Sequence, residues 1–286
     1  MGEEISMKLR CTFDAAVAGV IEALLLVALA AIVLSTIQLV YIPEIMEQRE
    51  VDHMDQVDNQ FSYLKSVVDL QTSLTENVPI SSPITLGSRE MPYFVTARAF
   101  GQLDIIDGTS SWIKTDFVSD GEIPLTSIRL DVMNSYFVDQ LYALEGGAVF
   151  VQQSDGESVR IEPSLTVQNQ STQIQITWRL PKFTSIAGKN STGGYKNCFV
   201  RTNYSESTVY QGATTYIYIY SDFLDAWNAT FCDVLEEAIE NGYINVQKYP
   251  AADPTYLKIT PGTKNIYLDL TLFTIGAQIG PGVVVQ

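Results

Sequence analysis

One carboxylate lies inside an apolar stretch near the start of this 286-residue sequence. Glu22 stands within the run FDAAVAGVIEALLLVALAAIVLSTIQLVYIPE, which is otherwise almost uncharged. A carboxylate inside a membrane helix costs about 2.5–3.5 kcal/mol on insertion scales, so it usually has a partner. Two interpretations stay open from the residues alone. Glu22 pairs with a group on another chain, or its side chain reaches back to the membrane surface.

Other side chains that could do chemistry are few. His53 is the one histidine, and a single histidine argues against histidine metal sites and against Ser-His-Asp catalysis. We expect His53 to be solvated on a charged helix. Two copies of SDGE pair Asp120 with Glu122 and Asp155 with Glu157, which are oxygen ligands that calcium accepts. Both are far shorter than a calcium-binding loop, so we interpret them as hairpin turns and predict no metal site, cofactor or enzyme activity.

Two cysteines and four glycosylation sequons lie in the distal part of the chain. Cysteines in an extracellular domain most often pair, so we predict a disulfide between Cys198 and Cys232, with two separate buried thiols as the alternative. N-x-S/T sequons predict surface glycosylation, and Asn190, in a loop rich in glycine and serine, is the preferred acceptor. The predicted glycosylation sites are Asn169, Asn190, Asn203 and Asn228.

The charge balance is strongly acidic. The chain has 17 Lys and Arg against 33 Asp and Glu, for a net charge of −16. Binding to nucleic acid needs a basic surface that neutralises phosphates. We therefore expect no nucleic-acid partner and interpret the charge as a soluble, self-repelling exterior surface.

The element that holds Glu22 is a long apolar helix. Residues 15–42 carry a single charge, and 28 helical residues span about 42 Å, more than a hydrocarbon core of about 30 Å. Lys8 and Arg10 precede this run and Glu44 and Glu47 follow it, so the positive-inside rule predicts a cytoplasmic N-terminus. A secretory signal cut near ALAA and a plain single-pass anchor are the competing interpretations. The apolar run continues well past ALAA, which favours retention of the segment.

The leader MKLRCTFDAA followed by VAGVIEALLLVALAAIVLSTIQLVYIP resembles the class III signal region of archaeal type IV pilin-like proteins. The resemblance implies that a prepilin peptidase cuts before the apolar run and that the helix becomes the core of a filament. A cut between Ala16 and Val17 follows a small residue and is preferred over a cut after Val17, which would make Glu22 the fifth mature residue. The resemblance also implies that Glu22 pairs with the amine of a neighbouring subunit.

Weaker similarity extends further along the chain. The stretches VPISSPITLGSREMPYF, LEGGAVFVQQSDGESVRIEPSLTV and SDFLDAWNATF look like uncharacterised methanogen-type members of the same family. These stretches carry no mechanism of their own.

After Pro43 the pattern becomes amphipathic. Apolar residues recur at spacings of mostly three, four or seven, which predicts a helix with one apolar face. This face is predicted to pack on a strand domain, with a coiled-coil seam as the alternative, and Pro43 can kink the helix. The stripe consists of Ile45, Val51, Met54, Val57, Phe61, Leu64, Val68 and Leu74.

The sequence after the amphipathic helix predicts strands separated by turns. Short alternating runs with close turns predict an antiparallel sandwich, and TYIYIYS places Tyr216, Tyr218 and Tyr220 on one face. One helix is predicted over 221–242, from a Ser221 cap to Gly242, with an apolar face repeating every four residues. That face consists of Phe223, Trp227, Phe231, Leu235 and Ile239.

These observations predict an α+β protein: a long N-terminal transmembrane and amphipathic helix followed by a β-rich, antiparallel, sandwich-like exterior domain with one inserted helix. The segments are a cleaved leader at 1–16, a filament-core helix at 17–42, an amphipathic stalk at 43–78 and an extracellular domain at 79–286.

The resemblance favours a structural subunit, major, minor or tip, of an archaeal type IV pilus-like filament. Its implied partners are further copies of itself in a helical homo-oligomer, the membrane, the prepilin peptidase and the pilus assembly machinery. The precursor would lie in the cell membrane and the mature protein at the cell surface. The alternative is a monomeric, single-pass membrane-anchored domain that binds a ligand or acts as a hydrolase.

Overall fold

A computed structural model gives the arrangement of the chain. It describes residues 2–88, 90, 98–108, 110–118, 121–186, 190–252 and 255–281, and the side chains of all of these except 2–18 and 281.

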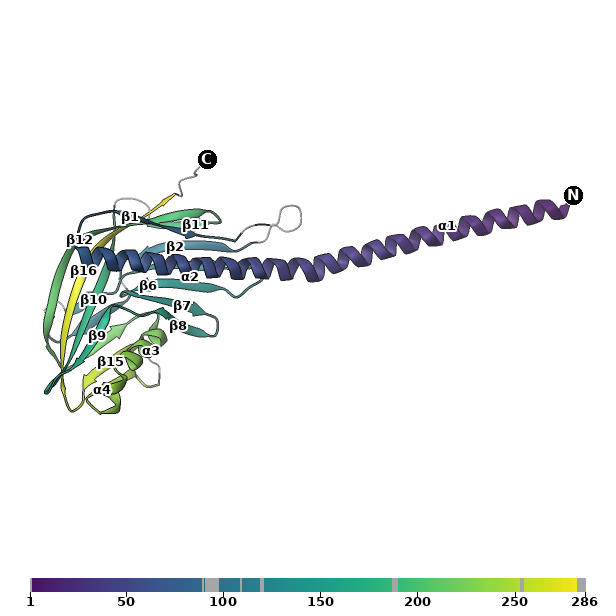
Figure 1. Ribbon diagram of the computed structural model, residues 1–286. Helices are drawn as coiled ribbons and strands as arrows, with labels where there is room; N and C mark the ends of the chain where they lie inside the picture. Colours follow the sequence, from purple (N-terminus) through teal and green to yellow (C-terminus); the bar gives the residue numbers. More distant parts are fainter. Residues whose placement is uncertain are drawn as a thin grey trace.

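The N-terminal part is one continuous helical rod, which projects from the β-rich domain (Figure 1). It consists of α1 (Gly2–Thr36), a π-helical turn η1 (Ile37–Tyr41) and α2 (Ile42–Leu74). Pro43 has no N–H to donate and its ring crowds the preceding turn. The wider turn, in which the Ile42 N–H donates to the Ile37 carbonyl, accommodates the proline, and the ribbon changes direction there, as predicted.

In the described part of the chain the strands form three sheets. The first, sheet A, has the order β1 (Ile80–Thr85), β12 (Asn197–Thr214), β16 (Asn265–Pro281), β10 (Gln173–Ser185) and β9 (Leu165–Asn169). The second, sheet C, has the order β11 (Ser191–Gly194), β2 (Phe100–Ile106), β5 (Ser127–Met133), β6 (Gln140–Glu145), β7 (Ala148–Gln153) and β8 (Gly156–Ile161).

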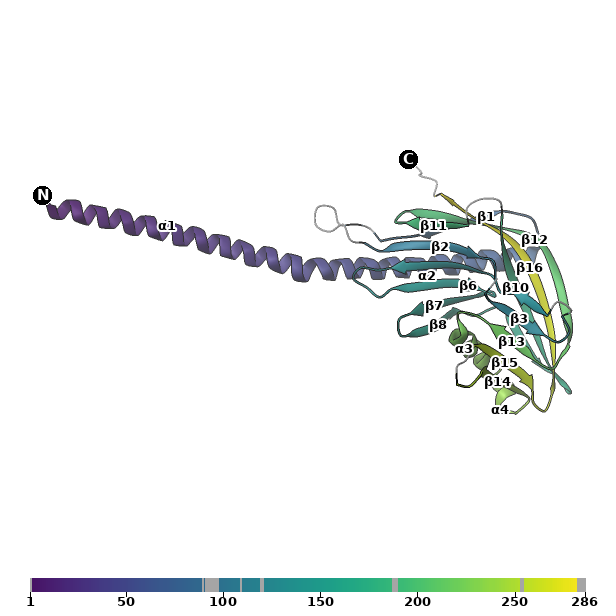
Figure 2. The same cartoon turned by 180° about the vertical axis from the view of Figure 1, so that it is seen from behind.

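The third, sheet D, has the order β14 (Ile244–Tyr249), β15 (Tyr256–Pro261), β13 (Ile217–Tyr220), β3 (Trp112–Thr115) and β4 (Glu122–Pro124). Figure 2 shows its strands at the end of the domain that lies away from the helical rod. The pairings are antiparallel except that β10 runs parallel to β16, which departs from the all-antiparallel prediction.

The predicted packing of the amphipathic helix on the strands is confirmed. One face of α2 enters a hydrophobic cluster, here called the helix core, with strands of sheets A and C. The buried face differs from the predicted stripe, because Ile45 and Leu74 are exposed while Met46 is buried. The α2 members of the helix core are Met54, Val57, Phe61, Leu64 and Val68.

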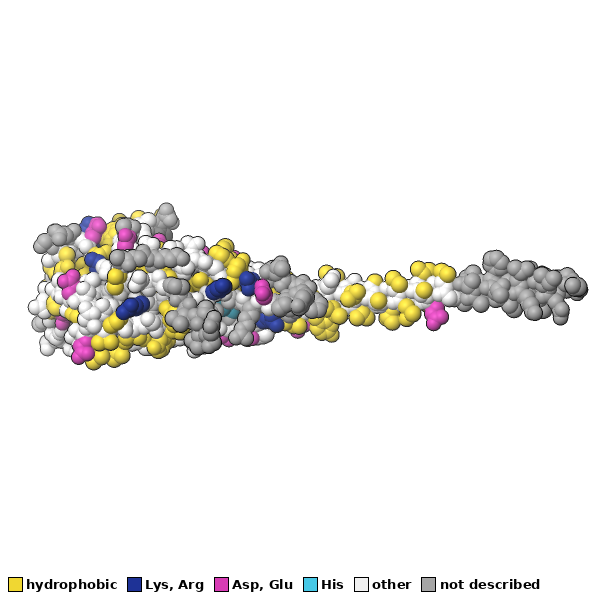
Figure 3. All heavy atoms as spheres, turned by 90° about the horizontal axis from the view of Figure 1, so that it is seen from above, with side chains coloured by type: hydrophobic (Ala, Val, Ile, Leu, Met, Phe, Trp, Pro, Cys, Tyr) yellow, Lys and Arg dark blue, Asp and Glu magenta, His cyan; other side chains and the backbone are white. Residues whose placement is uncertain are grey.

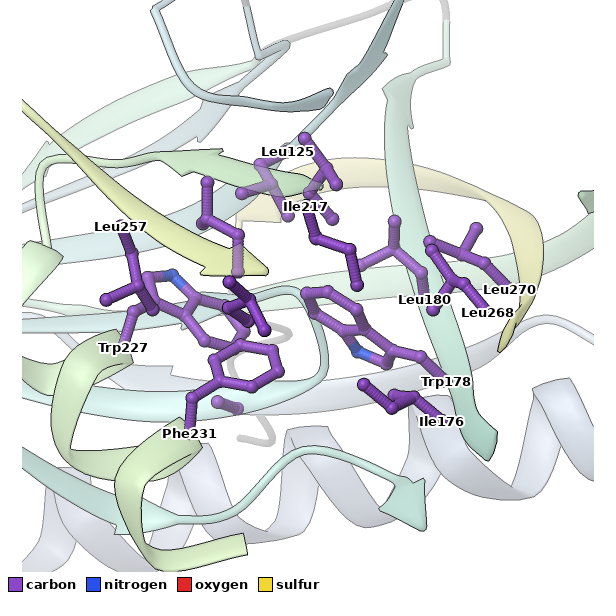
Figure 4. Close-up of a cluster of buried hydrophobic side chains, with 14 of the residues drawn as sticks. Leu125, Ile176, Trp178, Leu180, Ile217, Trp227, Phe231, Leu257, Leu268 and Leu270 are labelled. Atoms are coloured by element: carbon purple, nitrogen blue, oxygen red, sulfur yellow. The ribbon is translucent and has the colours of Figure 1, made fainter. Parts of the chain in front are cut away.

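A second cluster, here called the tryptophan core, lies between sheet D, part of sheet A and two short helices. Trp178 and Trp227 pack edge to face with centroids 5.4 Å apart, and Phe231 joins both rings (Figure 4). Gly146 must be glycine here, because its φ is +60° and a Cβ would lie 2.7 Å from the Trp227 ring.

The inserted helix is confirmed but divided. It forms α3 (Leu224–Val234) and α4 (Glu236–Glu240), with an irregular residue, Leu235, between them. The predicted apolar face is buried or partly buried in the tryptophan core. At the ends, Ser221 Oγ accepts from the Phe223 N–H, and Gly242 takes a φ of +67° as the helix terminates.

Candidate assembly site

The exposed part of the rod is the first candidate for function. Residues 19–41 are exposed throughout, with Val27 67% and Leu39 76% accessible, and apolar side chains cover this segment (Figure 3). By length and composition the rod fits a membrane anchor or a signal sequence, and none of its most apolar window is buried within the chain. An apolar surface of this size is unstable in water, so lipid or protein must cover it.

Glu22 is exposed on this apolar helix. No hydrogen-bond or ion-pair partner for it lies among the described side chains, which begin at Gly19. Glu22 lies 20 positions before Ile42, the first buried residue among the described side chains of the rod, and this length of helix spans about 30 Å, the thickness of a hydrocarbon core. The geometry is therefore compatible with Glu22 at the far membrane surface as well as with a partner on another chain.

Ala16 and Val17, the predicted cleavage position, belong to the stretch of α1 whose side chains are outside the described residues. The cleavage stays a prediction.

A buried carboxylate fastens the rod to the domain where the exposed segment ends. Glu50 is fully buried and accepts three backbone N–H groups, from Ser135 at 3.0 Å, Tyr136 at 2.7 Å and Phe137 at 2.7 Å. These donors lie in the loop between β5 and β6. Charged hydrogen bonds contribute about 1.5–3 kcal/mol each. The sequence assigned Glu50 no role, because one acid on an amphipathic helix gives no sign of this contact.

A second polar contact lies one turn further along α2. His53 is 4% exposed, and its Nε2 donates to the Thr85 carbonyl of β1 at 2.9 Å, so the expectation of a solvated histidine is wrong. Burial lowers the pKa of His53 below 6.5, although the Thr85 hydrogen bond and the Glu50 charge act in the opposite direction. Gln60 continues the contact by donating to the Thr85 hydroxyl and accepting from its N–H.

A cavity of about 500 Å³ opens beside this contact. His53 Nδ1 is buried without a partner among the described residues, and Arg49 donates to the Glu90 carbonyl at 2.9 Å. The lining offers donors and acceptors of both charge signs, so it selects no single ligand class. Its walls include Arg49, Asp52, His53, Ser88, Glu90 and Asn197.

The predicted disulfide between Cys198 and Cys232 is not formed. Cys232 is an exposed thiol on α3, with its Sγ 3.9 Å from Asn228 Oδ1. Cys198 is buried on β12 in the helix core. One residue is buried in the helix core and the other is exposed on the surface of α3, which the order of residues along the chain could not reveal.

The four sequons occupy different environments. Asn169 and Asn190 are exposed, and the preferred Asn190 directly precedes the edge strand β11. Asn203 is partly buried on β12, with its Oδ1 buried and unpartnered among the described residues. Asn228 lies on α3, and the threonine of its sequon, Thr230, is buried. Accessibility therefore favours Asn169 and Asn190 as acceptors, and their glycosylation stays a prediction.

The carboxylates of the SDGE elements take structural roles where the structure describes them. Glu157 accepts the backbone N–H groups of Asp225 and Ala226 at 3.0 and 3.1 Å, and so binds the N-terminus of α3. Glu122 forms an ion pair with Lys114 at 3.7 Å, and Asp120 lies outside the described residues. No group of three or more His, Cys, Asp or Glu is arranged to hold a metal ion within the described part of the chain.

Comparisons with protein-family models, with curated proteins and with solved structures gave no match to this chain. Function must therefore be inferred from its own residues.

Proposed function

We propose that the chain is a structural subunit of an extracellular type IV pilus-like filament, assembled through its N-terminal apolar helix. The observation that carries the proposal is the rod itself. Its outer part, residues 19–41, is exposed and apolar, and it continues without a break into a part that is built into the β-rich domain. Copies of such a rod can exchange lipid contacts for contacts with each other, while the domains remain outside.

Rigid attachment of the rod supports this function. A filament subunit must transmit force from its packed helix to its outer domain. The Glu50 hydrogen bonds, the His53 contact and the apolar face of α2 all hold the rod in one orientation. A simple tether between an anchor and a domain would need none of these contacts.

In the filament Glu22 meets the amine of a neighbouring subunit. The exposed carboxylate has apolar neighbours on its own helix, and an unpaired acid among packed apolar helices is costly. The basic residues before the apolar run support an orientation with the β-rich domain outside the membrane. The precursor would then be held in the cell membrane until the peptidase cuts near Ala16.

Mass spectrometry of the native N-terminus, with electron microscopy of surface fibres, tests this function. A mature protein that begins near Val17 and is identified in purified fibres supports it. A solitary protein in detergent that keeps Lys8 and Arg10 contradicts it and favours the anchored monomeric domain.

Replacing Glu22 tests the assembly role separately. Glu22→Ala should leave membrane insertion unchanged or improved, because the cost of the buried acid is removed. The yield of filaments should fall, because the contact between Glu22 and the amine of the neighbouring subunit is lost. The measurement is filament mass per cell against the amount of membrane-inserted precursor, with Glu47→Ala on the exposed face of α2 as the matched control. Equal filament yields for Glu22→Ala and wild type would eliminate this role.

A further inference from the structure

The outer face of sheet D carries a continuous line of aromatic side chains, here called the aromatic row. Strand pairing places Tyr249 opposite Tyr256 and Tyr220 opposite Trp112. The Tyr256 and Tyr220 rings join the two pairs, with centroids 4.9 Å apart, and Trp112 pairs with Pro124 at the last strand. The row thus crosses four of the five strands of the sheet, over about 14 Å at about 4.8 Å per strand.

The row faces away from the tryptophan core. Along β13 and β15 the alternate residues Ile217, Ile219, Leu257 and Ile259 are buried in that core. Side chains of successive strand residues point to opposite faces, so Tyr218, Tyr220 and Tyr256 lie on the other face. This aromatic face is not needed to fill the interior.

The rings stand on edge. Tyr220 lies 3.8 Å from Trp112 and 4.9 Å from Tyr256 between centroids, with interplanar angles of 29° and 26°. Nearly parallel rings at such short separations must stack face to face. The faces therefore cover one another, and the surface presents ring edges, which carry partial positive charge. Tyr249, at one end of the row, is 44% exposed.

Cations lie beside the row although the chain as a whole carries a net charge of −16. Lys258 Nζ lies 5.9 Å from the Tyr218 ring and 5.4 Å from the Tyr249 ring. No carboxylate lies within ion-pair distance of Lys258 among the described residues. Lys114 Nζ lies 5.7 Å from the Trp112 ring and forms an ion pair with Glu122 at 3.7 Å.

We propose that the aromatic row binds an acidic polysaccharide. Positive ring edges and the unpaired Lys258 ammonium attract carboxylate and hydroxyl oxygens. An open row about 14 Å long suits several units of a linear polymer better than a compact ligand, which would need a concave pocket. Charge complementarity is local to this sheet face, since Lys258 and Lys114 lie beside the row although the whole chain carries a net charge of −16. This inference goes beyond filament assembly and does not depend on it.

The test uses the full chain in detergent and immobilised polygalacturonate, with immobilised dextran as the uncharged comparison. Wild type should be retained on polygalacturonate only, and retention should weaken as salt is added. Lys258→Glu should reduce affinity by about tenfold or more, because a charged hydrogen bond is lost and a repulsive charge is introduced. Tyr249→Ser should reduce affinity by a smaller factor.

Lys264→Glu is the matched control, because Lys264 also lies over a tyrosine, 4.2 Å from the Tyr243 ring, but away from the row. Its affinity should equal that of wild type. Far-ultraviolet circular dichroism and a thermal melt establish that each variant is folded, and the exposed position of Tyr249 keeps one variant available if Lys258→Glu unfolds. No retention of wild type, equal retention on dextran, equal affinity of Lys258→Glu and Lys264→Glu, or binding confined to acidic proteins or DNA would each overturn the proposal.

Discussion

The two halves of the rod differ in their surroundings, although one backbone runs through both. From Gly19 to Tyr41 every side chain is exposed, whereas from Ile42 onward apolar and polar groups alternate between burial and solvent. Residues 19–41 carry one charge, whereas α2 carries charged groups on its exposed face and at buried contacts. A helix surrounded only by an apolar environment needs only an apolar sequence. A helix that lies between a domain and water needs a specific partner for every polar group that it buries.

The largest expected difference in stability between the two parts of the rod is at Phe61. This ring is fully buried and packs against Tyr142, with centroids 5.6 Å apart. Phe61→Ala should lower the free energy of unfolding of the domain by about 3–5 kcal/mol, because it removes apolar burial and leaves a cavity. The matched change in the outer half, Leu26→Ala, should leave it unchanged within about 0.5 kcal/mol.

Guanidinium unfolding of the domain in detergent, followed by tryptophan fluorescence, measures both variants. Similar midpoints for Phe61→Ala and Leu26→Ala would show that the two halves do not differ as described.

The next largest loss of stability is expected at Glu50. Glu50→Ala leaves the N–H groups of Ser135, Tyr136 and Phe137 without their acceptor. Because this loop is exposed or half-buried, water can replace most of the three bonds, so we expect a net loss of about 1.5–3 kcal/mol in the free energy of unfolding rather than the sum of all three. Glu47, on the exposed face of the same helix, provides the control, and Glu47→Ala should change stability by less than about 0.5 kcal/mol. Hydrogen exchange at Tyr136 and Phe137 should rise in the Glu50 variant alone, and unchanged protection there would contradict the assignment.

The smallest effect is a dependence on pH at His53. Its pKa is lowered in the folded state, so folding favours the neutral ring. The stability that this provides is present above the unfolded pKa of about 6.5 and is lost as the pH falls towards the lower folded value. His53→Gln removes the titration. Wild type should therefore lose more stability than this variant between about pH 7.5 and about pH 5.5, and parallel losses would mean that His53 does not titrate with folding.

Local patterns in the sequence predicted the elements of the fold well. The apolar run, the stripe on α2, the face of the α3–α4 segment and the alternation of Tyr216, Tyr218 and Tyr220 each follow from spacing within one segment, and each is present. The role of Pro43 at the bend also followed from the chemistry of a single residue.

Contacts between distant segments could not be predicted in the same way. Glu50 looks like any other acid of an amphipathic helix until the loop 135–137 is brought against it, 85 residues later. The aromatic row needs the pairing of four strands drawn from three parts of the chain. The predicted disulfide was wrong for the same reason, since Cys198 is buried in the helix core whereas Cys232 is exposed on α3.

The position of β16 within sheet A has a consequence for biosynthesis. This strand follows every other described strand along the chain, yet it lies between β12 and β10 and pairs with both along most of its length. During translation the apolar helix therefore leaves the ribosome long before the sheet that buries α2 can close. Until residues 265–281 emerge, β10 and β12 keep unsatisfied edges, and the nascent domain is most vulnerable to misfolding and most dependent on chaperones in that interval.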